Sequence, residues 1–596
     1  MDSKKISVHK RGIEKTAQGG MLQTMSDEKN RKSIIICEYI STGINYVDDA
    51  FARGYTPVLV EGHYVGTPEV VAPFIEEREA INRRMKDRVK IIPEQENYED
   101  LLRLVKECDP AVVVAGSEFG VVIAAKLAAD LGLKGNPVDR IPAMTQKDAM
   151  QQALRDHGIR AVRGKIVASE EEASAFYKEL SATGKKEVVV KPSRGAGSSG
   201  VYLCGNEQEM LESVRKHFAE MTANNITDQR VLVQEQIVGT EYVVNTVSCE
   251  GKHRVVSVGQ YDKYKLSNGS NAYNYFRYVS KLGVGHSALL RYACQVADAI
   301  GIQYGPVHGE YMVDEEGPVL IEVNCRPMGG GLERKYSELV SGQHETDSAL
   351  DSYLDPIKFH LESLRPYRLK RYGASKDIVC TSDTEILSAP MLQICKRLKS
   401  YYSASFIMIG KTSAVRQTSD MDTEAGLIYL LSDDEQQVKD DCDLLHLLEI
   451  KYPMMLYQGA STWDVPDVPD CDLAQMMKDS SCHGSTLVFS DRECEVEGAE
   501  VVDERTLRKA YDSYEQGILD LTSQTSFADL ESAIQQIFMF MDKVRAGGRI
   551  IIPESTYSKM PYGMEGMEIL LKVHGDVIEL PAANDPSLLI AMRQEN

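Results

Sequence analysis

The sequence lacks the features that mark a membrane, secreted or zinc-binding protein. No apolar run approaches the roughly 18 uninterrupted residues of a membrane-spanning helix, and the basic N-terminus is not followed by the apolar segment of a signal peptide. The 12 cysteines are scattered, without a C-x-x-C pair or a Cys/His group at zinc spacing. These absences favour reduced thiols in a cytoplasmic protein.

Excess positive charge is also lacking. The 596 residues include 67 Lys and Arg against 89 Asp and Glu, which gives a formal net charge of −22. A chain this acidic has no general attraction for phosphate backbones or for acidic membrane surfaces, so we expect neither a nucleic-acid nor a membrane partner. Hydrophobic residues make up 43% and charged residues 26%, which is ordinary for a globular protein and excludes a mainly disordered chain.

Strand and helix patterns predict an α/β multidomain protein. Residues 1–32 are polar, and we expect a flexible N-terminal tail. Residues 33–137 alternate Val/Ile-rich strands with amphipathic helices, which is typical of an α/β domain with a parallel sheet. Residues 138–352 contain mostly antiparallel strand pairs, and residues 353–460 indicate a small α+β unit. Residues 471–596 alternate strands and helices again.

A glycine-rich segment formed by Gly195, Gly197, Ser198, Ser199 and Gly200 is a literal G-x-G-x-x-G. A dinucleotide-binding fold would begin a helix at this point. Strand-like sequence flanks the segment on both sides, so we predict a hairpin instead. Such a hairpin can fold over a triphosphate and offer it backbone N–H groups with no side chains in the way. Taken alone, the segment fits a plain tight hairpin equally well.

Residues on either side of this loop have the chemistry of a nucleotide site. Lys191 ends the strand that enters the loop, where its ammonium group can reach phosphates, and Lys147 lies upstream. Downstream, Glu235 begins an extended linker in which the backbone of Ile237 can pair with an adenine edge. The carboxylate of Glu241 can then accept hydrogen bonds from the ribose hydroxyls.

Two later predicted strands have the residues of a metal site. Glu310 and Glu322 fall on successive antiparallel strands, which can point both carboxylates to one face. Asn324 is two residues after Glu322 and shares that face. Three oxygen ligands at one place are what Mg²⁺ bridging ATP phosphates requires. Arg326, again two residues on, lies on the same side, and its planar fork suits a phosphate or a carboxylate.

This ordered set resembles the ATP-grasp superfamily. The matching pieces are the lysine of TQKDAM, the VVVKP strand with its glycine loop, the E-x-x-x-G-x-E linker and the E…E-x-N-x-R strands. They cover about residues 33–350 and imply an α/β domain followed by two α+β subdomains that grip ATP. The stretch GPVHGEYMVDEEGPVLIEVNCRPMGGG looks like the L-amino-acid ligase branch, which makes dipeptides, and residues 353–460 fit the extra C-terminal piece of such ligases.

The resemblance implies an ATP- and Mg²⁺-dependent carboxylate–amine ligase, with Mn²⁺ able to replace Mg²⁺. Such enzymes phosphorylate a carboxylate with ATP and let an amine attack the acyl phosphate, giving a dipeptide or amide, ADP and phosphate. Lys147, Lys191 and the glycine loop would orient the phosphates, and the two strand glutamates with Asn324 would hold the metal. Arg326 would hold the substrate carboxylate or the developing charge. The partners would be a small acid and a small amine, and enzymes of this architecture are often homodimers.

Other functions remain open at this point. A ligase of a natural-product pathway would act on a carrier protein or on an unusual acid and amine. A carboxylase-type enzyme would activate bicarbonate, although no segment resembles a biotin-carrying Met-Lys-Met. An inactive scaffold would only bind ligands, and the intact Lys, Glu, Asn and Arg set counts against it.

Three further features each have two interpretations. Lys263 is either another phosphate contact or a solvated lysine at a strand end. His308 is either a substrate contact or a structural histidine. The tyrosine-rich residues 273–278, in a predicted polar loop, either stack on a substrate or pack locally.

Residues 471–596 resemble the latter part of a class I methyltransferase, a Rossmann-like fold, and the closing stretch MEGMEILLKVHGDVIELPAANDPSLLIAM fits the final hairpin of that family. However, no glycine-rich loop follows the first strand of this region, STLVFSDRECEVEG. In that family the loop lets the backbone approach the methionine part of S-adenosylmethionine. We therefore expect a degenerate methyltransferase-like domain that serves in packing, dimerisation or partner contact.

Overall fold

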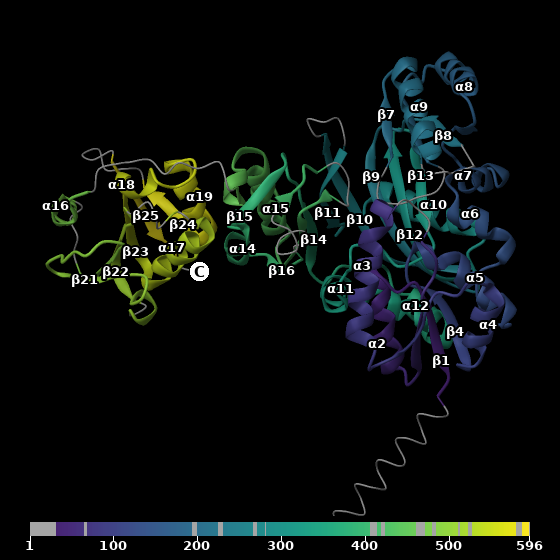
Figure 1. Cartoon of the computed structure of the whole chain (residues 1–596), viewed down its shortest axis with the longest axis horizontal. Coiled ribbons are helices and arrows are strands. Elements are labelled where there is room, and N and C mark those ends of the chain that lie inside the picture. Colours follow the sequence, from purple (N-terminus) through teal and green to yellow (C-terminus); the bar gives the residue numbers. More distant parts are fainter. Residues whose placement is uncertain are drawn as a thin grey trace, which may run out of the picture. The chain divides into compact units, whose positions relative to one another are not determined.

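The computed structural model divides the chain into two compact units (Figure 1). Unit 1 contains Met1–Ala196, Gly200–Gln260 and Val279–Lys370, and unit 2 contains Gly197–Ser199, Tyr261–Tyr278 and Arg371–Asn596. The structure describes residues 31–594 except 65–67, 193–199, 224–229, 266–270, 281, 406–413, 419–422, 460–470, 480–483, 511–512, 523–526, 528 and 580–586. The predicted tail thus lies almost wholly outside the described residues. None of the described helices is long and apolar enough to cross a membrane.

Unit 1 begins with a parallel sheet that helices cover on both faces. Its elements are β1 (Ser33–Cys37), α2 (Asn45–Ala52), β2 (Thr56–Val60), α3 (Pro68–Met85), β3 (Lys90–Ile92), α4 (Tyr98–Lys106), β4 (Pro110–Ala115) and α5 (Val121–Asp130). The strand order is β3-β2-β1-β4. Ile34 and Ile36 of β1 pack with α2 and α3, whereas Ile35 and Cys37 pack with α4 and α5. A strand buried on both faces needs a continuous apolar run, which explains the sequence SIIIC.

The strand order brings the ends of β1 and β4 side by side. The chain runs from β1 outward to β2 and β3 and then returns to the other side of β1 as β4. In open α/β sheets, ligands bind beyond the carboxyl ends of the strands at such a reversal. Glu118 lies at this position, in the 3-10 turn η2 (Glu118–Gly120) that follows β4. Gly120 permits the close approach, because a Cβ there would lie 2.1 Å from the Cys37 carbonyl oxygen.

A small antiparallel sheet follows in unit 1. Its elements are β5 (Gly164–Val167), α8 (Glu170–Ala182), β6 (Val188–Pro192), β7 (Tyr202–Cys204), α9 (Glu207–Ala223) and β8 (Val231–Glu235), with the strand order β5-β8-β6-β7. Val188 and Val190 of β6 pack with α8 and α9. β6 and β7 flank the glycine-rich segment and pair antiparallel, as predicted for a hairpin. Residues 193–199 themselves are outside the described residues.

The larger sheet of unit 1 is antiparallel in the order β13-β12-β9-β10. Its elements are β9 (Thr240–Cys249), β10 (Lys252–Lys265, in unit 1 as far as Gln260), β12 (Tyr304–Asp314) and β13 (Gly317–Asn324). The surrounding helices are α6 (Ile141–Thr145), α7 (Lys147–Asp156), α10 (Val284–Ile300), α11 (Arg334–Ser341), α12 (Glu345–Leu354) and α13 (Pro356–Ser363). The register places Glu310 opposite Glu322 and His308 opposite Asn324.

The first part of unit 2 combines an antiparallel sheet with one long helix. The strands are β11 (Asn271–Tyr278), β14 (Tyr372–Ile378), β18 (Gly426–Ser432) and β16 (Tyr401–Ser405) in that order, and the helix is α15 (Glu435–Lys451). A smaller sheet has the order β17 (Ala414–Val415), β15 (Thr384–Ser388), β19 (Gln458–Gly459). Lys376 of β14 and Glu449 of α15 are fully buried and form an ion pair of 2.6 Å.

The second part of unit 2 is a six-stranded sheet. Its strands are β20 (Thr486–Ser490), β21 (Ala499–Val502), β22 (Tyr514–Asp520), β23 (Val544–Pro553), β24 (Asp576–Glu579) and β25 (Leu588–Arg593). The order is β21-β20-β22-β23-β25-β24, with β25 antiparallel to both of its neighbours and the others parallel. Helix α17 (Leu530–Lys543) packs on this sheet, and its core is continuous with that of β14, β18 and α15. The two units divide at Lys370/Arg371, which is not one of the predicted domain boundaries. The boundaries predicted at residues 137, 352, 460 and 471 remain predictions.

Two local predictions differ from the structure. The YNYFRY segment, expected in a polar loop, belongs to β11, which pairs with β14 about a hundred residues later in the chain. The segment MEILLKVH, expected in a terminal hairpin, belongs to helix α19 (Met564–His574), which precedes β24. Gly575 ends this helix in the left-handed conformation with a φ of 94°.

His574, the last residue of α19, provides a pH-dependent contact in unit 2. Its Nε2 lies 3.1 Å from Asp542 Oδ1 and its Nδ1 lies 2.8 Å from Asp576 Oδ2. Burial lowers the pKa of His574, but its hydrogen bonds to Asp542 and Asp576 outweigh burial, so the pKa is raised. The His574 and Arg397 contacts hold the pKa of Asp542 well below its usual range despite burial.

We expect the stability that His574 contributes to be lost as the pH rises through its raised pKa. The folded state binds the proton more tightly than the unfolded chain does, so the contribution is complete below the ordinary histidine pKa of 6.5. At the acid end, the depressed pKa of Asp542 makes its contribution fall as the carboxylate is protonated. Calorimetry of wild type and His574→Gln should show a difference in unfolding temperature at about pH 6 that shrinks by about pH 9. A difference independent of pH would contradict this assignment.

Candidate active site

Charged residues from several elements of unit 1 converge around Lys191. Lys191, on β6, is buried, and burial lowers the pKa of its ammonium group to about 8. This pKa of about 8 is the balance between burial and the charge of Lys147, the first residue of α7, which lower the pKa, and Glu322, Glu310 and Glu241, which raise it. The structure therefore brings together five residues that the sequence predicted for one nucleotide and metal site.

Lys147 and Glu322 make direct contact at the centre of this group. Lys147 Nζ lies 3.0 Å from Glu322 Oε2, and the side chains are only 10% and 13% exposed. A buried ammonium group needs a partner of opposite charge, and Glu322 supplies it. With Lys191 nearby, two ammonium groups stand where water is largely excluded, which strengthens their attraction for phosphate oxygens.

The oxygen-bearing side chains fit a hard cation such as Mg²⁺. Glu310 and Glu322 face each other across β12 and β13. The hydrogen-bond donors and acceptors around Asn324 require its amide nitrogen to lie 3.2 Å from Glu322 Oε1 and 3.0 Å from Glu118 Oε2. A half-turn of this amide would present its oxygen instead. Two carboxylates and an amide oxygen are ligands that Mg²⁺ accepts, so these residues fit the predicted cation.

The sequence did not single out Glu118, yet it lies within this site. Arg326 Nε is 3.9 Å from Glu118 Oε2, and the Glu118 side chain is 24% exposed. Burial raises the pKa of Glu118 to about 7 against the charge of Arg326, and Glu322 adds to the rise. Beside it, Ser117 is buried, and its Oγ has no hydrogen-bond partner among the described residues. A carboxylate just after a parallel strand at the point of order reversal was the signal that could have revealed Glu118.

The segment after Arg326 is fixed to the first sheet of unit 1. The Gly331 N–H donates to Ser41 Oγ, and the Leu332 N–H donates to Thr42 Oγ1, both at 3.0 Å. Asn45 Nδ2 donates to the Leu332 carbonyl oxygen at 2.8 Å. These contacts hold the segment against the turn η1 (Ser41–Ile44) and the start of α2.

The structure describes only some of the other residues that were predicted to contact the nucleotide. Gly195, Gly197, Ser198 and Ser199 lie outside the described residues, so their roles remain predictions. The carboxylate of Glu235 is occupied by Arg163, with Oε2 2.9 Å from Nη2 and Oε1 accepting the Arg163 N–H at 2.9 Å. A contact from Glu235 to adenine would therefore come from its backbone. Ile237 is half-buried in the linker between β8 and β9.

Lys263 and the tyrosine-rich strand pack against each other in unit 2. Lys263 Nζ lies 4.1 Å from the centroid of the Tyr273 ring and 5.3 Å from that of Tyr261. Tyr273, Phe276 and Tyr278 are buried. These contacts fit the interpretation of local packing. The role of Lys263 as a phosphate contact remains a prediction.

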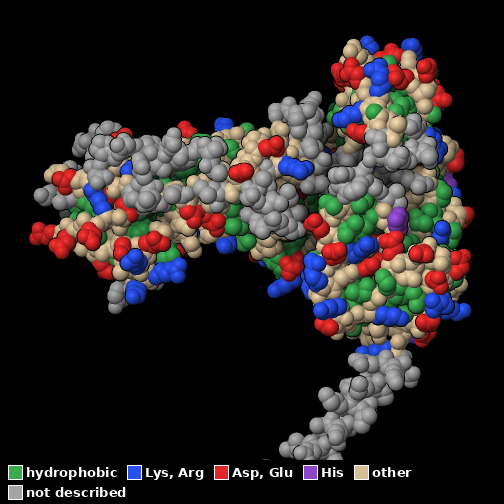
Figure 2. Space-filling model, viewed as in Figure 1, with side chains coloured by type: hydrophobic (Ala, Val, Ile, Leu, Met, Phe, Trp, Pro, Cys, Tyr) green, Lys and Arg blue, Asp and Glu red, His purple; other side chains and the backbone are tan. Residues whose placement is uncertain are grey.

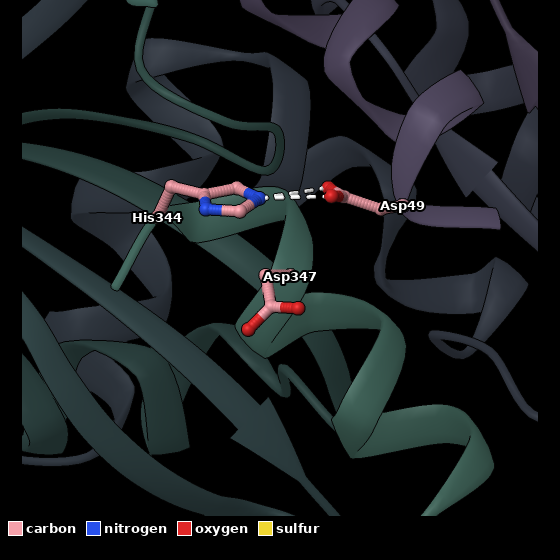
Figure 3. Close-up of side chains that lie close together, drawn as sticks. All are labelled: Asp49, His344 and Asp347. Atoms are coloured by element: carbon pink, nitrogen blue, oxygen red, sulfur yellow. Dashed lines mark hydrogen bonds and ion pairs between the residues drawn. The ribbon is translucent and has the colours of Figure 1, made fainter. Parts of the chain in front are cut away.

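Asp49, His344 and Asp347 form a separate acidic cluster that has the composition of a metal site (Figure 3). Figure 3 shows His344 Nε2 directed at the Asp49 carboxylate, at 2.9 and 3.0 Å from its two oxygens. Protein cations already neutralise both aspartates, since Arg334 Nη2 lies 3.2 Å from Asp49 and Arg53 Nη2 lies 2.6 Å from Asp347. The cluster therefore serves as a contact between α2 and α12.

Comparison with known proteins identifies the fold. Residues 185–334 match the ATP-grasp domain family. The matched stretch includes the metal-strand glutamates and Arg326, whereas Lys147 and Glu118 precede it. The structure is also similar to the crystal structure of L-amino acid ligase from Bacillus licheniformis, with a TM-score of 0.53 and 18% identity over 70% of this chain and 97% of that chain. The chain thus contains an ATP-grasp α/β fold with mixed sheets.

Two curated relatives are similar over longer stretches than the matched domain at residues 185–334. The chain is 29% identical to dapdiamide A synthase from Enterobacter agglomerans over 346 residues, which cover 58% of this chain and 78% of that protein. It is 22% identical to phosphoribosylamine–glycine ligase from Methanococcus vannielii over 235 residues, which cover 36% of this chain and only 53% of that relative.

Proposed function

We propose that this protein is an ATP-dependent carboxylate–amine ligase that joins two small molecules, an acid and an amine, into a dipeptide or related amide. The proposal depends chiefly on the convergence of Lys147, Lys191, Glu310 and Glu322, beside which Glu118 meets Arg326. The likeness to dapdiamide A synthase and to L-amino acid ligase supports this reaction class.

In the first step, a substrate carboxylate oxygen attacks the γ-phosphorus of ATP, and each group of side chains would have its own role in this step. Lys147 and Lys191 would neutralise and orient the phosphates. Glu310, Glu322 and Asn324 would hold Mg²⁺, or Mn²⁺ in its place, and the bound cation would supply charge that polarises phosphoryl oxygens. Arg326, held 3.9 Å from Glu118, would bind a substrate carboxylate or the developing negative charge. This step gives an acyl phosphate and ADP.

Glu118 is suited to the second step. The amine substrate arrives as an ammonium ion and must lose a proton before its nitrogen attacks the acyl carbon and displaces phosphate. A carboxylate with a pKa of about 7 can first bind the ammonium group and then accept this proton near neutral pH. Glu118 is partly exposed, so an incoming amine can reach it.

We expect Glu118→Gln to impair the amine step selectively. Loss of the proton acceptor should lower kcat/KM for the amine by about 10²- to 10⁴-fold. Acyl phosphate formation should persist, because the phosphate-binding and cation-binding groups remain, and hydroxylamine should still trap the intermediate as a hydroxamate. Glu107→Gln, a change at an exposed residue near the end of α4, is the matched control. Equal loss of hydroxamate and amide formation would contradict the role in the amine step.

Phosphate release from ATP across an array of amino acids, singly and in pairs, tests the ligase itself. Release that needs two amino acids, with the product identified by mass spectrometry, would support the proposal and identify the substrates. Release with bicarbonate alone would instead indicate a carboxylase-type enzyme. Release only with a carrier-linked or otherwise unusual acid would favour a natural-product ligase.

We further propose that residues 471–596 form a degenerate, Rossmann-like methyltransferase-like domain. The order β21-β20-β22-β23-β25-β24 with an antiparallel β25 supports this assignment. The reversal between β20 and β22, where such a sheet would bind a cofactor, contains an ion pair of 2.9 Å between Arg492 and Asp520. Ser490 Oγ donates to the same Asp520 at 2.8 Å. We expect equilibrium dialysis to show no binding of S-adenosylmethionine.

A further inference from the structure

A buried chain of polar side chains leads away from Glu310. His308, two residues earlier on β12, lies between β13 and β9, where its register partners are Asn324 and Asn245. Both His308 and Asn245 are buried, Asn245 completely. His308 Nε2 is 3.2 Å from Glu310 Oε1, and Nδ1 is 2.8 Å from Asn245 Oδ1. Buried polar groups in such a row are costly unless each has a partner.

The contacts of Asn245 fix the orientation of this chain. Asn245 Nδ2 donates to Ser257 Oγ at 2.8 Å and to Met328 Sδ at 3.4 Å. The amide oxygen of Asn245 therefore faces His308 Nδ1. This hydrogen bond sets the imidazole ring so that Nε2 is directed at the Glu310 carboxylate.

The other end of the chain reaches the segment that follows Arg326. Met328, which contacts Asn245, is two residues after Arg326, and its N–H donates to Glu345 Oε2 at 2.7 Å. A single row of contacts thus connects a predicted cation ligand on one side with the predicted substrate-binding arginine segment on the other.

We infer that His308 and Asn245 are positioning residues for the cation site. His308 aims the Glu310 carboxylate, and Asn245 sets the ring of His308 and the distance to the Met328 segment. Residues that orient a ligand from behind typically change metal affinity or activity by about 10- to 100-fold when they are removed. This inference depends on the proposed cation site and adds to it two residues that lie behind the predicted ligands.

Binding of Mn²⁺ in the presence of ADP, followed by electron paramagnetic resonance, tests the inference without turnover. His308→Ala should weaken Mn²⁺ binding by about 10- to 100-fold. His308→Gln should recover part of the affinity, because a side-chain amide can take the place of Nε2 beside Glu310. His157→Ala, at an exposed histidine whose Nδ1 lies 2.8 Å from the Ala153 carbonyl oxygen of α7, should bind Mn²⁺ like wild type.

A double-mutant cycle tests whether Asn245 acts through His308. If it does, His308→Ala combined with Asn245→Ala should weaken Mn²⁺ binding no more than His308→Ala alone. Unchanged Mn²⁺ affinity in both His308 variants, with only a lower unfolding temperature, would overturn the inference and leave a structural histidine. Wild-type affinity in Glu310→Gln would instead show that the cation site itself is assigned wrongly.

Discussion

Glu322→Gln is expected to reduce amide formation by about a thousandfold, which corresponds to about 4 kcal/mol of lost transition-state stabilisation. Glu322 is a predicted cation ligand and also the ion-pair partner of Lys147 at 3.0 Å. The substitution preserves the shape of the side chain but removes its charge, so both the cation and Lys147 lose a partner. Steady-state phosphate release with the active pair of substrates measures the effect.

Glu315→Gln is the matched control for this experiment. Glu315 is exposed and lies in the turn that joins the same two strands, so its substitution should leave phosphate release within about twofold of wild type. Equal unfolding temperatures for both variants would show that the loss arises at the site. A Glu322→Gln enzyme with near wild-type turnover would exclude Glu322 as a cation ligand.

Lys376→Met is expected to lower the free energy of unfolding of unit 2 by about 3–5 kcal/mol. Lys376 and Glu449 are both fully buried, and Glu449 Oε1 also accepts the Val379 N–H at 2.9 Å. Removing the lysine leaves a carboxylate without its counter-ion in the core, and the surrounding apolar residues cannot solvate it. Urea denaturation of the full chain measures the change.

Two variants complete the test of the buried pair. Lys376→Met combined with Glu449→Met should regain most of the stability, since no uncompensated charge remains. Arg371→Met breaks the exposed pair with Asp433 at the start of the same strand and should cost less than about 1 kcal/mol. A single Lys376→Met variant as stable as Arg371→Met would mean that water reaches Glu449.

Local spacing was sufficient to predict much of the candidate site. Glu322 and Asn324 alternate along β13, so their shared side follows from the two-residue period of a strand, whereas Arg326 lies in the bend after the strand ends. The pairing of Glu310 with Glu322 follows from the short turn between their strands. These relationships involve neighbours in sequence, and sequence patterns report such neighbours well.

Contacts between distant segments could not be predicted in the same way. Glu118 precedes Arg326 by about two hundred residues, and only the order of the first sheet brings its turn to the site. The strand β11 forms because β14 offers it a partner, although its own flanking sequence indicates a loop. In α19, Met and Leu spacing is compatible with both a helix and a strand, and tertiary packing decides between them.

The attachment of residues 329–332 to Ser41, Thr42 and Asn45 has a consequence for how this protein can be recombined. A chimaera could receive from a relative only the stretch that matches the ATP-grasp family, residues 185–334. The imported segment after the arginine would then have to contact Ser41, Thr42 and Asn45 of this protein, with which it did not evolve. Such an exchange would also separate Glu118 from Arg326. The smallest portion that can be exchanged with its chemistry intact therefore begins at β1 and extends through the whole of unit 1.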